Sequence, residues 1–204
     1  GHEDHIGALP YVIDDLDCPV YGTRLTIGIL QNKLSEHRLE HNPMLNTVNA
    51  GDKIKLGAFS VEFIHVNHSI ADACALAIRT PAGLVVHSGD FKIDLTPIDG
   101  DMIDLARFGE LGKEGVLLYL GESTNSERAG YTPSERKVGQ SLDGIFMKNA
   151  DKRLVIATFS SNVHRVQQII DTSVQYGRKV VITGRSMQNI VSAAIELGYM
   201  DVPE

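Results

Sequence analysis

The order of apolar and polar positions predicts two parts of different architecture along the chain of 204 residues. In the first part, short helical patterns alternate with strand patterns, and glycine-containing turns join several of the strands. Helices are expected over residues 6–16, 25–37, 102–111 and 132–148, and strands over 18–21, 53–56, 59–66, 75–79, 84–87 and 116–120. Because the strand over 116–120 is apolar throughout, we expect it to be buried on both faces.

After residue 149 the pattern changes to strand, helix, strand, helix with short links. The strands are expected over residues 154–159 and 180–183, and the helices over 162–176 and 186–197. This order is typical of a parallel, doubly wound sheet. We therefore predict a boundary near residue 150, between a first domain of residues 1–149 and a second of residues 150–204.

Composition narrows the class of protein. Hydrophobic residues make up 43% of the chain and charged residues 22%, which is typical of a globular protein and not of a disordered one. The sequence contains no apolar run long enough for a membrane helix and no signal-peptide pattern. Two cysteines, Cys18 and Cys74, are too few for a disulfide framework. We expect them to be buried, reduced thiols of a cytoplasmic protein with no membrane partner.

The formal net charge of -7 gives no general basic surface that would attract nucleic acid. A polyanionic substrate would need a local positive centre, which bound metal cations can supply.

The first residues of the chain suggest such a centre. His2, Asp4 and His5 offer imidazole nitrogens and a carboxylate, which Zn²⁺ and Mn²⁺ accept as ligands. They are expected on the loop before a helix, although a short cluster of this kind also arises by chance. Because metal ligands need a fixed geometry and chain termini usually fray, we expect this sequence to be part of a longer protein.

Three further polar residues follow the ends of predicted strands: His68, Asp90 and Glu122. Each has a simpler explanation by itself, such as a structural histidine or an Asx turn for Asp90. Together with the first cluster, they fit a site assembled at one rim of a sheet. His65 and His87 lie inside strands, where packing roles are more common than metal binding.

The order and spacing of these residues resemble the metallo-β-lactamase superfamily and, within it, the β-CASP nucleases, most closely the bacterial ribonuclease J family. HEDH at residues 2–5 resembles the motif HxHxDH without its first histidine. His68 in VNHSIAD resembles the third-motif histidine, and Asp90 in HSGDFK the bridging aspartate. Glu122 in GESTN resembles the acidic motif of the β-CASP group. The segments 157–168 and 184–187 resemble the opening of the β-CASP domain.

The resemblance implies an α/β fold, with part of a metallo-β-lactamase αββα sandwich followed by the start of a doubly wound parallel β-CASP domain. It also implies two Zn²⁺ ions, or Mn²⁺ as in some relatives, with a metal-bridging hydroxide as nucleophile. His2 and His68 would hold one metal, Asp4 and His5 the other, and Asp90 would bridge them. Glu122 would orient a histidine further along the chain. The family's late histidines are expected beyond residue 204, so this chain alone is expected to bind metal poorly.

The resemblance further implies RNA contacts at the start of the second domain. Ser161, Asn162 and Arg165 open a predicted helix, and Arg185 occupies the matching position after the next strand. A helix N-terminus beside an arginine is a ready phosphate site. The simpler alternative is a capped helix with a solvated arginine.

The function implied is a metal-dependent ribonuclease of RNA processing and decay, including ribosomal RNA, that cleaves internally and from the 5′ end. In the full-length protein it would form a homo-oligomer or a hetero-oligomer with a paralogue. Three alternatives stay open: a DNA-repair β-CASP nuclease, a small-molecule hydrolase, and a catalytically weak paralogue that binds RNA. The strand and helix pattern after residue 150 disfavours the small-molecule hydrolase, which needs no second domain.

Overall fold

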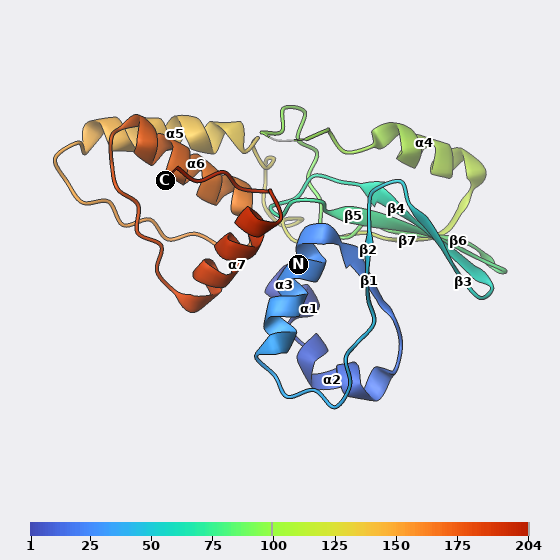
Figure 1. The fold of residues 1–204 in the computed structure, drawn as a ribbon. Coiled ribbons are helices and arrows are strands. Elements are labelled where there is room, and N and C mark those ends of the chain that lie inside the picture. The colour runs from blue at the N-terminus through green and yellow to red at the C-terminus, as the bar shows by residue number, and fades with distance from the viewer. Residues whose placement is uncertain (99, 204) are drawn as a thin grey trace.

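The computed structural model describes residues 1–98 and 100–203. Its main sheet has the strand order β3-β4-β5-β6-β7. The strands are β3 (Lys53–Leu56), β4 (Phe59–His65), β5 (Cys74–Thr80), β6 (Gly83–His87) and β7 (Val116–Leu120). Neighbours from β3 to β6 are antiparallel, whereas β6 and β7 are parallel. The sheet lies at one side of the molecule and the last three helices at the other (Figure 1). The α/β class is thus confirmed.

A smaller sheet pairs β1 (Val20–Thr23) with β2 (Leu45–Val48) in parallel, and α3 (Arg24–Ser35) connects them. Strand β2 was not predicted, because its sequence mixes apolar and polar residues without a clear alternation. The expectation of a buried Cys18 was wrong: this residue is exposed, in the loop that follows Asp17 with its left-handed φ of 31°. Strand β1 begins only after this loop.

The helix expected over residues 6–16 is two helices, α1 (Glu3–Ile6) and α2 (Leu9–Leu16). Gly7 ends α1 by donating its N–H to the carbonyl of Glu3, and Pro10 stands in the first turn of α2. Asp4 and His5 therefore lie on a helical turn and not on a loop before a helix.

Helix α4 (Leu105–Glu114) covers one face of the main sheet (Figure 1). Leu111 of this helix is buried together with Ile64, Ala77 and Val86 of the strands. The helix begins later than predicted because the carboxylate of Asp104 caps it, accepting the N–H of Arg107 at 2.9 Å.

The last three helices are α5 (Arg136–Lys148), α6 (Val163–Gln175) and α7 (Arg185–Glu196). Helix α5 packs on α6, where the Tyr176 hydroxyl donates to the Asp143 carboxylate at 2.8 Å. Helix α5 begins later than the predicted start at residue 132: Glu135 occupies the N-cap position, and Ser134 is hydrogen-bonded to Thr96.

One hydrophobic core joins the first and last parts of the chain. It combines Leu25 and Leu30 of α3 with Val163 and Val166 of α6 and Ala194 of α7. The domain boundary near residue 150 stays a prediction, but the two sides of it share this core and are packed as one unit.

The strands expected over 154–159 and 180–183 are not formed, so the described residues contain no parallel sheet after residue 150. A strand needs neighbours that take up its N–H and C=O groups and cover its side chains. No described segment does so here, and Val155, Phe159 and Val181 are 91%, 80% and 86% exposed.

Strand β7 is formed as predicted, but its expected burial was wrong. Every residue from Val116 to Leu120 is exposed, and β7 is an edge strand of the sheet. Among the described residues, no helix is long and apolar enough to cross a membrane.

Candidate metal centre

Three separate segments bring polar side chains to one point. His2 is the N-cap of α1, and Asp4 and His5 lie on that helix. His68 follows β4 and Asp90 follows β6, so both come from the same end of the main sheet region. Strand ends and a one-turn helix thus place side chains from distant parts of the sequence together.

Two groups of ligand atoms result, and Asp90 belongs to both. In the first, His2 Nδ1 lies 3.2 Å from His68 Nε2, which is 3.7 Å from Asp90 Oδ2. In the second, His5 Nε2 lies 3.0 Å from Asp90 Oδ2 and 3.8 Å from Asp4 Oδ2. In each group the atoms lie within 4.8 Å of one another. Such spacing suits two cations that share one carboxylate.

The local backbone explains how Asp90 reaches this point. Gly89 has a φ of 59°, a left-handed conformation that favours glycine. A Cβ atom on Gly89 would lie 3.0 Å from the carbonyl oxygen of Cys74 on the neighbouring strand. The glycine therefore permits both the sharp turn after β6 and its close approach to β5.

The two partly buried histidines, His2 and His68, are electrostatically suited to hold a cation. Burial lowers the pKa of His2 to about 4, and the neighbouring His68 imidazole adds to the shift. Burial also lowers the pKa of His68, against the opposing effect of the Asp90 carboxylate. Both imidazoles are consequently neutral at pH 7, which is the form that binds metals.

Four of the five ligand residues, His2, His5, His68 and Asp90, line a depression of about 270 Å³ together with other polar and apolar residues. Ser69, which the sequence analysis did not single out, lies beside the first ligand group, with its hydroxyl 3.3 Å from His2 Nε2. Its position next to His68 in the sequence was the only available signal. His65 and His87 lie at the ends of β4 and β6 and belong to neither ligand group: His65 Nε2 contacts the carbonyl oxygen of Asp101, and His87 Nδ1 accepts the N–H of Gly89.

Glu122 lies beside the centre without joining either ligand group. Its carboxylate accepts the N–H of Thr124 at 2.7 Å, and its own N–H donates to Ser88 Oγ at 3.1 Å. Its negative charge is close enough to raise the pKa of His68, opposing the effect of burial. This position at the margin suits an orienting role rather than direct ligation.

The four predicted RNA-binding residues divide into two kinds. Asn162 is buried and its side chain caps α6 by accepting the N–H of Arg165 at 3.1 Å. The Arg165 guanidinium is paired with Glu135 through Nε at 2.7 Å and Nη2 at 3.0 Å. Both side chains are therefore engaged in contacts within the protein.

Ser161 and Arg185 stand at the starts of α6 and α7. A hydrogen bond of 2.9 Å between Ser160 Oγ and Ser186 Oγ joins these two helix starts. Arg185 is exposed and lines a groove of about 430 Å³ between α3 and α7. Its guanidinium is thus accessible from solvent.

Known proteins resemble both the sequence and the fold of this chain. Residues 151–204 match the family model described as the β-CASP domain of ribonuclease J. Over its whole length the chain is similar to ribonuclease J. It is 46% identical to ribonuclease J of Helicobacter pylori over 99% of its length, and 48% identical to that of a Synechocystis strain over 100%. Against ribonuclease J of Thermus thermophilus the identity is 43% over 100% of the chain.

The chain spans only part of these ribonuclease J relatives, namely 29%, 32% and 37% of their respective lengths. In three dimensions it is similar to a protein of unknown function from Enterococcus faecalis, with a TM-score of 0.68 and 23% identity. That similarity covers 90% of this chain and 44% of the other, and it concerns the fold alone.

Proposed function

We propose that this chain carries the metal-binding part of a ribonuclease that hydrolyses RNA phosphodiesters with divalent metal ions, internally and from the 5′ end. One observation carries the proposal: two ligand groups from three segments of the chain share the carboxylate of Asp90. Two-metal sites of this kind clamp the attacking and leaving oxygens of a phosphodiester. The similarity to ribonuclease J supports RNA as the substrate.

The role of each residue follows from its group. His2 and His68 would hold one metal, Asp4 and His5 the other, with Asp90 between them. Neutral imidazoles and carboxylates are suited to Zn²⁺, which we propose as the ion, with Mn²⁺ as the alternative. When bound, such ions lower the pKa of water and stabilise the charge that develops on phosphate. Glu122 would orient a neighbouring ligand from the margin of the site.

Ser161 and Arg185 are proposed to hold the RNA backbone. The starts of α6 and α7 present backbone N–H groups, and Arg185 adds a full positive charge beside them. Asn162 supports this surface through the cap of α6, whereas the Arg165 guanidinium is held in the ion pair with Glu135.

The deciding experiment uses the full-length protein and a 5′-monophosphorylated RNA beside the same sequence as DNA. We expect metal-dependent cleavage of the RNA alone, and loss of cleavage in Asp90→Ala. Cleavage of the DNA instead would indicate a DNA-repair nuclease of the β-CASP group. Binding of RNA without cleavage of either substrate would indicate a paralogue that only binds RNA.

Two further expectations belong to the full-length protein. We propose a homo-oligomer or a hetero-oligomer with a paralogue, which sedimentation analysis would test. We also propose a cytoplasmic location, since both cysteines are free thiols. Fluorescence imaging of the tagged protein in its host would test this location.

A further inference from the structure

Four charged side chains connect the last helices to the segment that carries Asp90. Glu135 Oε1 and Oε2 accept hydrogen bonds from Arg165 at 2.7 and 3.0 Å. Lys92 Nζ lies 3.6 Å from Glu135 Oε2 and 3.3 Å from Asp94 Oδ2. The backbone N–H of Glu135 donates to the same Asp94 carboxylate at 3.2 Å. We call these residues the Glu135 network.

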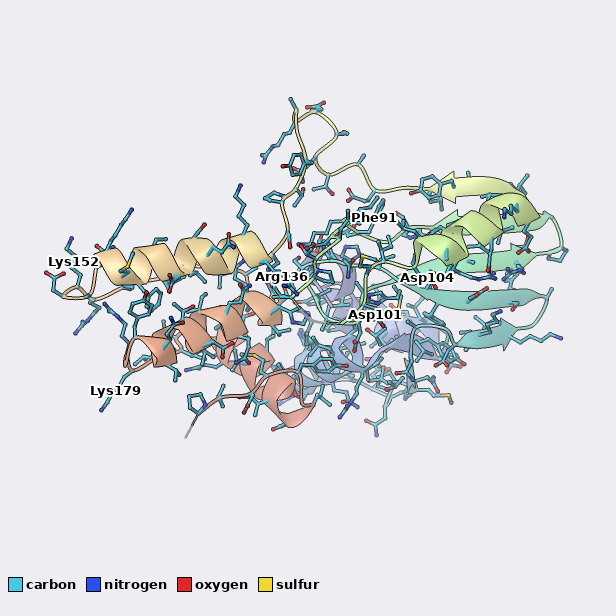
Figure 2. All side chains as sticks on the ribbon, turned by 90° about the horizontal axis from the view of Figure 1, so that it is seen from above. Phe91, Asp101, Asp104, Arg136, Lys152 and Lys179 are labelled. Carbon is cyan, nitrogen blue, oxygen red and sulfur yellow. The ribbon has the colours of Figure 1, made fainter. Side chains whose placement is uncertain are left out.

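The network reaches the metal centre through Lys92. This residue follows Asp90 by two positions, and its backbone N–H donates to the Asn67 carbonyl at 2.7 Å. Asn67 directly precedes His68, so one hydrogen bond joins the two segments that provide ligands. Figure 2 shows Phe91 near the middle of the molecule, and Arg136, next to Glu135, at the end of α5 that faces the sheet.

Burial makes the network more than a surface ion pair. The side chains of Asp94, Glu135 and Lys92 are only 2%, 12% and 18% exposed, and that of Arg165 is 32% exposed. Two positive and two negative groups balance each other. At such sites, removing one partner leaves an uncompensated charge, and the remaining groups rearrange.

The geometry at Arg165 is specific to an arginine. Its two hydrogen bonds come from Nε and Nη2 and reach both oxygens of one carboxylate. A lysine keeps the charge but cannot form this planar, two-point contact. Arg165 thus fixes the orientation of Glu135, and Glu135 fixes where Lys92 places its ammonium group.

We propose that Arg165 is a positioning residue for the metal centre, which acts through Glu135 and Lys92 on the segment of Asp90 rather than by binding RNA. This inference rests on the proposed metal-dependent function. It differs from the sequence-based expectation, in which Arg165 contacts the substrate.

The test uses Arg165→Lys and Glu135→Gln in the full-length protein, with the metal removed and Mn²⁺ then titrated by calorimetry. Both variants should weaken Mn²⁺ binding by about 10-fold, as for residues that orient metal ligands. The kcat for RNA should fall by a similar factor, while RNA affinity without metal stays within about twofold of wild type. The double variant should bind Mn²⁺ no more weakly than Glu135→Gln alone, because both changes break the same connection.

Glu114→Gln is the matched control, since Glu114 also accepts a two-point contact from an arginine, Arg79, near the C-terminal end of the central strand β5. It should leave Mn²⁺ affinity unchanged. Weaker RNA binding with unchanged Mn²⁺ affinity in Arg165→Lys would overturn the proposal and indicate that Arg165 contacts RNA. Unchanged values for both would overturn it in favour of a plain structural ion pair.

Asp90→Ala in the same titration separates this inference from the proposed function. If Asp90→Ala loses Mn²⁺ binding and Arg165→Lys does not, only the positioning role fails. If Asp90→Ala binds Mn²⁺ as wild type does, the metal centre itself is wrong. Circular dichroism of each variant verifies that the fold is retained.

Discussion

His5 and Asp90 are separated by 85 positions in the sequence, yet His5 Nε2 lies 3.0 Å from Asp90 Oδ2. This contact joins α1 to the end of β6 and defines one of the two ligand groups. Asp90 also belongs to the other group, so its carboxylate is the ligand that the two groups share.

Asp90→Ala is therefore expected to abolish RNA cleavage in the full-length protein while the fold is retained. Residues that merely orient ligands cost 10- to 100-fold when changed, so the loss of a shared ligand should exceed about 100-fold. Metal content by mass spectrometry should fall in parallel. Asp101→Ala, an exposed carboxylate in the loop before α4, is the control and should keep both activity and metal. Wild-type cleavage by Asp90→Ala would rule out the bridging role.

That these candidate ligands lie close together could be predicted from the sequence, because they follow recognisable local patterns. His68 and Asp90 stand where apolar strands end, and His2 and His5 form a dense cluster with Asp4. The hairpins of the main sheet were equally clear, since glycine turns separate alternating strands. Local pattern and tertiary structure agree in these segments.

Other features depend on contacts that no local pattern contains. The apolar residues at 154–159 resemble a strand, but a strand forms only with neighbours, and none of the described segments pairs with this one. The pairing of Arg165 with Glu135 joins residues 30 positions apart, and nothing near either residue indicates it. Helix α5 likewise begins later than predicted, at Arg136: Ser134 is hydrogen-bonded to Thr96, 38 positions away, and its hydroxyl also accepts the N–H of Arg136 at 3.3 Å.

Glu62 gives the fold a defined dependence on pH. Hydrogen bonds from Arg107, and then from Arg79, lower the pKa of this buried carboxyl from 4.5 to about 2. Because the folded-state pKa lies below the unfolded value, the ionised carboxylate stabilises the fold fully above about pH 4.5. This contribution is lost as the pH falls toward 2.

Glu62→Gln removes the charge and should lower the free energy of unfolding at pH 7 by about 3 kcal/mol, as for a broken buried ion pair. Urea denaturation of both proteins between pH 2 and 7 measures the difference. The gap between wild type and variant should close as the pH is lowered. A gap that is constant with pH would show that Glu62 stabilises by packing and not by its charge.

The two cysteines should differ strongly in reactivity. Cys18 is exposed, whereas burial raises the pKa of the Cys74 thiol to about 12. Because the thiolate is the reactive form, iodoacetamide at pH 8 should modify Cys18 first and leave Cys74 largely unmodified in the folded protein. Peptide mass spectrometry after timed quenching gives both rates, and denatured protein serves as the reference. Equal rates in the folded state would contradict the burial of Cys74.

The shared core predicts that α3 and the last helices unfold together. Leu30 of α3 is 1% exposed and packs in the core that includes residues of α6 and α7. Leu30→Ala should lower the free energy of unfolding by about 2–5 kcal/mol and speed amide hydrogen exchange in α3 and α6 alike. Leu111→Ala is the matched control, equally buried but in the separate core between α4 and the main sheet. It should speed exchange in α4 and the strands and leave α6 unchanged. If Leu30→Ala affected α3 alone, the two parts of the chain would be independent folding units, and the C-terminal helices could not fix the position of the metal ligands.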